Sequence, residues 1–414
     1  MSILNKNIMI KIKLIKKRFR IENYFKEILK VSTKASKCSI QLLFINDTIN
    51  RNKLVMITAD LIWFSDKLTL EIKKMLSEEF KVSKANISLC ASHTHGTPNP
   101  ENNFQYKKAN KKLYSYILKL VEALILQIKN KKFEKTTVEY IRKKAPSISI
   151  NRRKKAIVFR PKVSYLTQSL PNNNGKTDNF IDIINFSNPK KKKILCSIIK
   201  YTCHPVTDPQ GMTGADYVGH LREILNKDYS DNIFFCQGYC GDIRPKLLNN
   251  NKDIKSIFIN LIIGKRFRKS NITDSKNFAA KLANSISSKK NIVISRKIKN
   301  VKSTKIKKIK LELNDKKLDT IALTLQFWKF DNIAFIFANA EMLSGYILDY
   351  YKGVPIMNVG YSNGMIGYIP TASDIKNGGY EVNKSRKIFN ILEKFNTNVE
   401  MKIKKTIFAC LDKK

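Results

Sequence analysis

Apolar segments of strand length alternate with amphipathic segments of helical length along this chain, and that alternation restricts the folds open to it. The runs IQLLFIN and KLVMITAD predict two strands that flank the turn DTINRN, and KLTLEIKKMLSEEF then predicts a helix with one apolar face. The run NISLCAS predicts the next strand. A longer helix is predicted after it from apolar residues at three- and four-residue spacing, which are Leu113, Ile117, Leu120, Val121, Leu124 and Ile128.

The same alternation continues along the rest of the chain. Strands are predicted at TTVEYI, IDIINF, ILCSIIKYTC and NIFFCQG, and helices at DYVGHLREILNK and SKNFAAKLANSISS. The segments IALTLQFWKF and NIAFIFANA predict a hairpin, and the second strand leads into a predicted helix at EMLSGYILDYY. Since 43% of the 414 residues are hydrophobic, a large core is available. We therefore predict an α/β fold with a mixed β-sheet core flanked by helices in a single large domain.

Both ends of the chain are expected to lie outside this domain. Residues 1–35 are basic and lack a clean period, apart from a short predicted helix around YFKEILK. We interpret them as a basic N-terminal leader. The main domain is then expected to span residues 36–390, with residues 391–414 as a basic C-terminal end.

The net charge of +45 invites a nucleic-acid interpretation, but its distribution argues against one. The chain has 78 Lys and Arg against 33 Asp and Glu, and the basic residues occur in nearly every segment together with many Asn and Ile. This is typical of a general compositional bias and a solvated surface rather than one basic face. No nucleic-acid-binding module is recognisable, so we expect no specific nucleic-acid partner and only weak, non-specific attraction to polyanions or membrane surfaces.

The cysteines and the hydropathy pattern indicate an intracellular protein. There are seven cysteines, an odd number, and most lie within apolar runs, which favours reduced, buried thiols over a disulfide framework. The N-terminal residues are interrupted too often by lysine for a secretory signal. No stretch approaches the roughly 18 apolar residues of a membrane span. We therefore predict a cytoplasmic location without a transmembrane segment.

All four histidines lie in segments that contain glycine or proline and follow apolar runs. In SLCASHTHGTP, strand alternation directs His93 and His95 to one side, so that one could bind a metal while the other contacts substrate. An isolated HTH is also compatible with a structural role. His204 precedes Pro205, which stiffens the turn that presents the ring. His220 falls in a predicted helix that begins near Asp216, where a packing or supporting role is expected.

The segment FFCQGYCGDIRP is the second region that could carry chemistry. Gly238, Gly241 and Asp242 follow the apolar strand. Two glycines around a carboxylate let backbone amides approach an anion or a carbonyl oxygen closely, and Asp242 is a candidate catalytic residue. The alternative is a tight turn in which Asp242 caps local amides. Cys236 and Cys240 lack a second pair at zinc-finger spacing and are expected to be packing residues.

Six motifs together resemble a known family. ASHTHGTP, YTCHPVT, TGADYVGHL, CQGYCGDIRP, NAEM and VGYSNGMIGYIPTASDIKNGGYEV occur in the order found in the N-terminal catalytic domain of the neutral/alkaline non-lysosomal ceramidase family. The resemblance spans roughly Ile40 to Val382. It identifies residues 36–390 with the zinc hydrolase domain of that family, in a shorter ceramidase-like branch without the immunoglobulin-like C-terminal domain.

The resemblance also implies a metal site. In that family zinc is held by the first His of the HTH-like motif, the His of the HP motif, a late Glu and the Tyr of a YE motif, which correspond here to His93, His204, Glu341 and Tyr380. Two imidazoles, a carboxylate and a phenolic oxygen form a coherent ligand set for zinc. The expected cofactor is therefore Zn.

Three further positions follow from the same motifs. His95 corresponds to a residue beside the reacting carbonyl, and Arg152 of SINRRK to an arginine that binds or polarises substrate. Ceramidases carry a serine in a GD-x-S-P loop, whereas this chain reads GDIRP and has Arg244 there. A guanidinium cannot act as that nucleophile, and it favours an anionic group nearby.

The sequence thus predicts a zinc-dependent hydrolase of an amide, N-acyl and ceramidase-like, that uses a zinc-activated water on a small-molecule or lipid-like acyl-amide substrate. The catalytic candidates are His95, Arg152, Asp242 and Arg244. The alternative is a catalytically silent ceramidase-like protein that binds a small anionic or acylated ligand.

Overall fold

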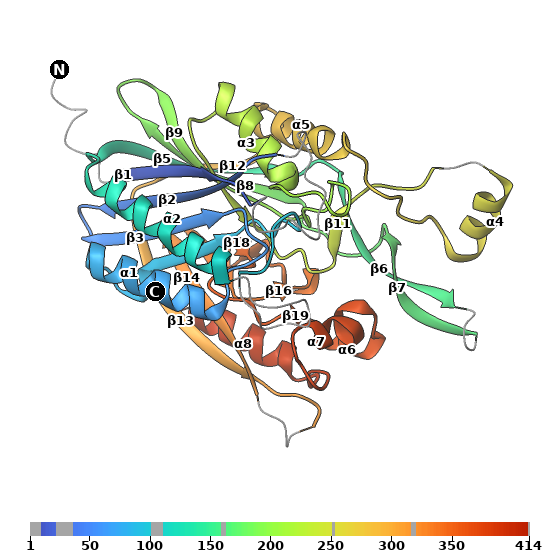
Figure 1. Cartoon of the computed structure of the whole chain (residues 1–414). Coiled ribbons are helices and arrows are strands. Elements are labelled where there is room, and N and C mark those ends of the chain that lie inside the picture. The colour runs from blue at the N-terminus through green and yellow to red at the C-terminus, as the bar shows by residue number, and fades with distance from the viewer. Residues whose placement is uncertain are drawn as a thin grey trace.

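Two β-sheets lie face to face at the centre of the fold, and helices cover their outer surfaces (Figure 1). The computed structural model describes residues 10–21, 36–100, 111–158, 163–250, 253–315 and 320–412. Apolar side chains from both sheets share one buried cluster, with Leu43 and Phe186 contributed by the larger sheet and Trp328 and Phe335 by the smaller. Burial of this interface on both sides explains the long apolar strand runs of the sequence.

Within the described residues, the larger sheet has nine strands in the order β10-β9-β8-β5-β1-β2-β3-β4, and β12 also pairs with β5. The sheet is mixed, because β3 with β4 and β9 with β10 run parallel while the other pairs run antiparallel. The strand bounds are β1 Ile10–Phe19, β2 Cys38–Asp47, β3 Asn52–Ala59, β4 Ile87–Ala91, β5 Glu134–Lys144, β8 Phe180–Asn188, β9 Lys193–Tyr201, β10 Ile233–Gln237 and β12 Ile292–Ile298.

The smaller sheet has five strands among the described residues, in the order β13-β14-β15-β18-β17, and its β15–β18 pair is parallel. Two minor sheets complete the strand structure: β11-β6-β7 and the parallel pair β16–β19. The bounds are β13 Val301–Leu311, β14 Ile321–Phe330, β15 Ile333–Ala338, β17 Tyr350–Tyr351, β18 Val354–Val359, β6 Ser149–Val158, β7 Ser164–Asn172, β11 Ile243–Pro245, β16 Glu341–Met342 and β19 Tyr368–Ile369.

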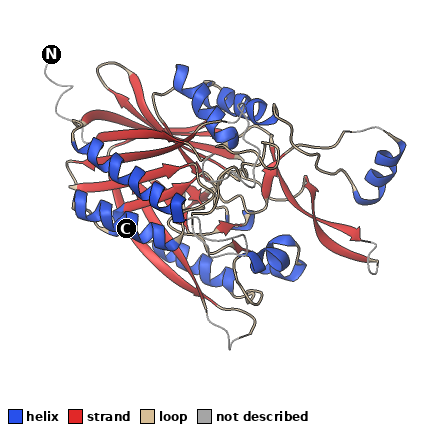
Figure 2. Ribbon diagram, viewed as in Figure 1, coloured by secondary structure: helices blue, strands red, loops and turns tan. Residues whose placement is uncertain are grey.

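Helices cover the outer face of each sheet (Figure 2). Helices α1 (Asp66–Phe80) and α2 (Lys111–Lys129) pack over β2, β3 and β4, and α3 (Asp216–Asp228) and α5 (Asp274–Ser287) pack over β8, β9 and β10. Helix α8 (Val399–Leu411) covers part of the smaller sheet. The remaining helical segments are α4 Ile254–Ile263, α6 Ala372–Asn377, α7 Ser385–Ile388 and the short turns η2 Lys84–Asn86, η3 Ser344–Tyr346 and η4 Tyr380–Lys384.

Local sequence signals fix several helix starts. Ser65 caps α1, because its side chain accepts a hydrogen bond from the Leu68 amide. At α6, Thr371 and Asp374 form a reciprocal capping box. These caps define where the chain leaves a strand or loop and enters a helix.

The predicted α/β architecture is confirmed: mixed sheets flanked by helices form one domain. The strands predicted at IQLLFIN, KLVMITAD and NISLCAS are β2, β3 and β4, and the predicted helices between residues 66 and 129 are α1 and α2. All seven cysteines are buried without disulfides, as the sequence indicated.

The prediction that both ends of the chain lie outside the main domain is wrong for the residues that the structure describes. Residues Ile10–Phe19 form β1, an interior strand of the larger sheet between β2 and β5, because Ile10 and Ile12 are buried in its core. The lysines that suggested a leader alternate with these apolar residues. Similarly, α8 packs into the core through Val399, Ile403 and Ile407. The short helix predicted around YFKEILK lies outside the described residues.

One predicted helix is also absent. The segment EMLSGYILDYY contains the short strands β16 and β17 and the 3₁₀ turn η3 instead of a continuous helix. Glu341 and Met342 pair in parallel with Tyr368 and Ile369, so tertiary pairing overrides the local helical pattern.

Candidate metal centre

The carboxyl ends of strands from both sheets meet in one group of loops. The Ala91 amide at the end of β4 donates to the carbonyl of Tyr361, which follows β18, at 3.1 Å. The Gly360 amide donates to the carbonyl of Gln237, the last residue of β10, at 2.9 Å. Such strand ends are where α/β proteins commonly assemble sites, and three of the four histidines lie here.

His93, His204 and Glu341 converge at this point. Oε2 of Glu341 lies 3.3 Å from Nε2 of His93 and 3.4 Å from Nε2 of His204. All three side chains are buried. Neither imidazole Nε2 makes a hydrogen bond among the described residues, although each is fully buried. Two buried nitrogen lone pairs and a carboxylate oxygen that face a common space are the donor set of a metal site.

Backbone carbonyls fix the orientation of both rings. Nδ1 of His93 lies 2.8 Å from the carbonyl oxygen of Ile62, and Nδ1 of His204 lies 2.6 Å from that of Cys240. Because a carbonyl can only accept a hydrogen bond, each ring donates from Nδ1 and leaves the Nε2 lone pair available. This arrangement of a backbone partner on the other ring nitrogen is typical of metal-binding histidines.

The third imidazole, His95, completes the group. One ring nitrogen from each of His93, His95 and His204 lies within 4.8 Å of the others. His95 differs in keeping solvent-accessible surface, whereas the other two are buried. Protein atoms packed around the His95 ring nevertheless hold its pKa well below the usual range, and the neighbouring His93 and His204 add to that effect.

Burial and neighbouring groups keep two of the candidate ligands, His204 and Glu341, in metal-binding forms. Burial lowers the pKa of His204 to about 4, so the ring is neutral at pH 7. Burial acts to raise the pKa of Glu341, but His93 and His204 outweigh it and hold that pKa well below the usual range. A neutral imidazole and an ionised carboxylate are the forms that coordinate a cation.

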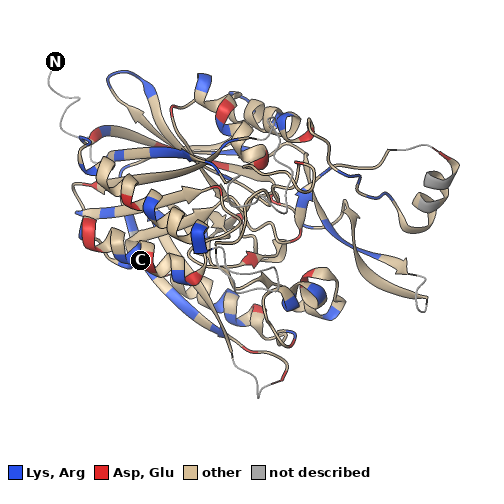
Figure 3. Ribbon diagram, in the orientation of Figure 1, with Lys and Arg blue, Asp and Glu red and all other residues tan. Residues whose placement is uncertain are grey.

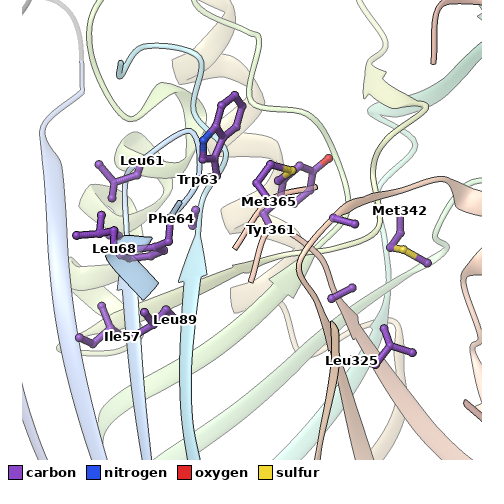
Figure 4. Close-up of a cluster of buried hydrophobic side chains, with 14 of the residues drawn as sticks. Ile57, Leu61, Trp63, Phe64, Leu68, Leu89, Leu325, Met342, Tyr361 and Met365 are labelled. Carbon is purple, nitrogen blue, oxygen red and sulfur yellow. The ribbon is translucent and has the colours of Figure 1, made fainter. Parts of the chain in front are cut away.

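Tyr361 is a site residue that the sequence reasoning missed. Its ring stacks on His93, with centroids 4.0 Å apart, and its hydroxyl donates to Oε2 of Glu341 at 3.4 Å. Both Tyr361 and His93 have positive φ, at 54° and 62°, a conformation that non-glycine residues adopt rarely. Figure 4 shows Tyr361 beside Met365 in the apolar cluster that supports the site.

Arg152, predicted as a substrate-binding residue, lies next to the imidazole group. Its guanidinium donates to Glu381 at 2.8 Å, to the Gly241 carbonyl at 2.8 Å and to the hydroxyl of Tyr368 at 3.2 Å. Its charge contributes to the lowered pKa of both His95 and His204. Arg152 is therefore fixed in place by an ion pair and adds positive potential to the site.

Tyr380, the predicted fourth ligand, packs against Arg152. Its ring is 5.6 Å from the guanidinium carbon and 5.9 Å from the ring of Tyr368. The side chain is half-exposed, unlike His93, His204 and Glu341. The structure thus brings three of the four predicted ligands into mutual contact, while coordination by Tyr380 stays a prediction.

Asp242 is held by neutral hydrogen-bond donors. Its carboxylate accepts from the Ser344 amide at 2.7 Å, the Ser344 hydroxyl at 2.7 Å and the Asn151 amide at 2.8 Å. Burial raises its pKa to about 6. These contacts match the alternative in which Asp242 caps local groups and joins three segments beneath the site.

Gly241 explains the glycine pattern of this loop. Its amide donates to the Met342 carbonyl at 3.0 Å, and a Cβ on it would lie 2.9 Å from the carbonyl oxygen of Glu341. The glycine therefore permits close packing of the loop against β16, which carries a candidate ligand.

Arg244 occupies the loop position discussed above and has an unusual environment. It lies on β11, opposite Ile150 of β6, and its guanidinium stacks 4.3 Å from the ring of Phe267. Its Nε is buried without a hydrogen-bond partner among the described residues. Burial, together with the charge of Arg152, lowers its pKa to about 10. An arginine in such surroundings is suited to bind an anion.

His220 lies outside the group of three imidazoles. It is in the second turn of α3, buried, with Nδ1 3.3 Å from Oε2 of Glu223. The packing role expected for it is consistent with this position.

Comparison with solved structures gives the fold a precedent. The neutral ceramidase from Pseudomonas aeruginosa superimposes with a TM-score of 0.72 at 12% identity, over 98% of this chain and 74% of that one. A ceramidase complexed with C2 gives a TM-score of 0.67 at 12% identity, over 97% and 75%. No protein-family model matches the sequence, and no curated protein matches it either. The fold is therefore ceramidase-like, and at this identity the likeness extends to the fold alone.

Proposed function

We propose that this protein is a zinc-dependent hydrolase that cleaves an amide bond, N-acyl and ceramidase-like, in a lipid-like or small-molecule substrate. The observation that carries this proposal is the pair of buried, unpartnered Nε2 atoms of His93 and His204, which face Oε2 of Glu341. The ceramidase-like fold supports it independently, because the two solved ceramidases share that fold.

The donor set fits zinc. His93, His204 and Glu341 would hold the ion, and Tyr380 is the expected fourth ligand. When bound, zinc would polarise a substrate carbonyl and lower the pKa of a bound water to about 7. The Tyr361 hydroxyl, 3.4 Å from Glu341, orients that carboxylate from outside the ligand set.

The remaining side chains have distinct roles in this proposal. His95 is neutral because its pKa is lowered, so it can accept a proton from the attacking water and pass it to the leaving amine. Arg152, fixed by Glu381, binds the carbonyl side of the substrate. Arg244 cannot act as a nucleophile, so hydrolysis proceeds by direct attack of water, without an acyl-enzyme.

Metal analysis of the purified protein together with a substrate screen tests the proposal. We expect about one zinc per chain, lost in His93→Ala and His204→Ala, and turnover of an acyl amide that is lost in the same variants. His220→Ala is the matched control, because it removes a buried histidine outside the site. Zinc well below one per several chains, and unaffected by His93→Ala, would contradict the proposal.

A second function is favoured by Arg244. Its Nε makes no hydrogen bond with the described residues, and the guanidinium carbon lies 4.3 Å from the centre of the Phe267 ring. A catalytically silent protein that binds a small anionic or acylated ligand would use this group. Tight binding of an acylated anion by the zinc-loaded protein, without turnover across the substrate screen, would favour this alternative.

The cytoplasmic location stays a prediction. Within the described residues, no helix has the length and apolarity needed to cross a bilayer.

A further inference from the structure

Part of the molecule extends away from the two stacked sheets. Figures 1 and 2 show α4 and the β6–β7 hairpin reaching outward from the body on the same side. We call this part the projecting arm and define it as the described residues of 149–172 and 246–269. Its root lies at the candidate metal centre, since β6 carries Arg152 and pairs with β11, which carries Arg244.

Helix α4 exposes apolar side chains on most of its surface. Its sequence, IKSIFINLII, contains only one charged residue. The exposed fractions are 87% for Ile254, 49% for Ile257, 63% for Phe258, 79% for Leu261 and 40% for Ile262. A helix that is apolar on nearly all sides is normally buried, so one that is exposed indicates a missing partner.

The hairpin adds to the same apolar surface. Val163, Tyr165 and Leu166 of this hairpin are 73%, 65% and 49% exposed. Helix α4 contacts β6, and Lys154 of β6 lies against Gly264 at the end of α4. The helix and the hairpin therefore form one structure, and their exposed apolar residues can meet one partner together.

Basic residues far outnumber acidic ones in the sequence of the arm. Residues 149–172 and 246–269 contain thirteen Lys and Arg but a single acidic residue, Asp253. Among them, Lys155, Lys246, Lys265 and Lys269 are exposed. Elsewhere in the molecule, basic and acidic residues are interspersed over the helices and strands (Figure 3). The arm thus combines exposed apolar groups with basic residues that few acidic residues of the arm offset, whereas both signs of charge alternate elsewhere.

We propose that the projecting arm docks on an anionic lipid bilayer, with α4 inserted at the headgroup boundary and the lysines against lipid phosphates. This combination of an apolar helix and flanking lysines is the one that binds the bilayer interface. A second copy of the chain is disfavoured as the partner, because the same basic residues would face one another in a molecule with a net charge of +45.

Docking would turn the side of the molecule that carries the arm toward the lipid. The arm shares strands with Arg152 and Arg244, so a bilayer held against α4 lies on the side of the molecule where these residues are rooted. The docking itself does not depend on the proposed hydrolase function, and its test contains no activity measurement.

Vesicle co-sedimentation of the full chain tests the proposal, with phosphatidylcholine vesicles either alone or containing about 30% phosphatidylserine. We expect binding to the mixed vesicles that falls at least about tenfold in the double variant Phe258→Gln with Leu261→Gln. The matched control is Leu70→Gln with Leu126→Gln on α1 and α2, where the side chains are 63% and 65% exposed. This control should bind like the wild type.

A tryptophan variant distinguishes insertion of α4 into the bilayer from binding by charge alone. Phe258→Trp places an indole on α4, and the two native tryptophans, Trp63 and Trp328, are buried. We expect its emission to shift to the blue on addition of mixed vesicles, and Leu70→Trp to show no shift. Equal sedimentation of the α4 double variant and its control, or no shift for Phe258→Trp, would overturn the proposal. Vesicle-independent self-association through α4 would overturn it as well.

Discussion

Two buried clusters of ionisable groups differ in how their charges are compensated. In the larger sheet, Arg142 lies 2.6 Å from Asp182, and Lys200 lies 2.7 Å from Asp178 and 2.8 Å from Asp182. Burial acts to raise the pKa of Asp182, but Lys200 and Arg142 outweigh it and lower that pKa. Two cations thus balance two carboxylates, and this cluster needs nothing from outside the chain.

The candidate metal centre lacks such a balance. Glu341 is as deeply buried, but its closest partners are imidazoles, and the pKa values of His204 and His95 are lowered. The nearest guanidinium, Arg152, is already paired with Glu381. A buried carboxylate beside unpartnered nitrogen lone pairs leaves a position that suits an added cation. Charge balance therefore distinguishes the structural cluster of the larger sheet from the candidate metal centre.

Removing one cation from the cluster of Arg142, Lys200, Asp178 and Asp182 should have the largest effect on stability. We expect Lys200→Met to lower the free energy of unfolding by about 3–5 kcal/mol, because it leaves two buried carboxylates with a single cation. The measurement is chemical denaturation at pH 7. Lys193→Met on the same strand is the control: Lys193 is 59% exposed and paired with Asp231, so its loss should cost less than about 1 kcal/mol. Similar losses in both variants would remove the distinction between the buried and the surface pair.

Adding zinc to the candidate metal centre should have the next largest effect. At a free zinc concentration of about 100 times the dissociation constant, we expect zinc to stabilise the wild type by about 2.7 kcal/mol. In Glu341→Gln this stabilisation should disappear. Thermal melts with and without zinc measure both quantities. Equal zinc stabilisation of the two proteins would contradict the assignment of Glu341.

Asp242 is an intermediate case, a buried carboxylate that is compensated by neutral donors only. Its pKa is raised from 3.8 to about 6 in the folded state, so its contribution to stability is greatest below pH 3.8 and is lost as pH rises toward 6. Asp242→Asn does not titrate. We therefore expect the stability gap between wild type and variant to narrow by about 2 kcal/mol between pH 4 and pH 7. Denaturation series at several pH values measure the gap, and a constant gap would argue against the raised pKa.

The smallest expected effect comes from the Tyr361 hydroxyl, which orients Glu341 in the candidate metal centre. Tyr361→Phe keeps the ring stacked on His93 but removes the hydroxyl that contacts Glu341 and lies 3.1 Å from Cys240 Sγ. We expect a weakening of zinc affinity by about tenfold with little change in fold stability. Competition with a chromophoric chelator measures the affinity. Unchanged affinity would show that Glu341 is oriented without the hydroxyl.

Periodicity predicted much of the fold, because β2, β3, α1 and α2 bury residues at the spacing of their own secondary structure. It missed β1, where lysines alternate with buried isoleucines, and the broken segment after Glu341, where pairing with β19 decides the structure. These outcomes depend on partners distant in sequence.

The candidate site was likewise predicted only in part from the sequence. Motif order pointed to His93, His204 and Glu341, which the structure brings together. Tyr361 lay inside a quoted motif, but no local pattern distinguishes it from the other tyrosines, since its stacking on His93 arises only when β4 and β18 meet. The exposed face of α4 could not be predicted either, because an apolar helix is normally assigned to the core.

The convergence of strand ends from both sheets has a consequence for folding kinetics. His93 and Glu341 are 248 positions apart along the chain. His93 follows β4 of the larger sheet, and Glu341 lies in β16, which comes directly after β15 of the smaller sheet. Contacts of such high contact order form late, since long loops must close first. The intact site can therefore exist only in molecules whose two sheets have already docked, and metal uptake during refolding should follow, rather than precede, the slowest step of chain assembly.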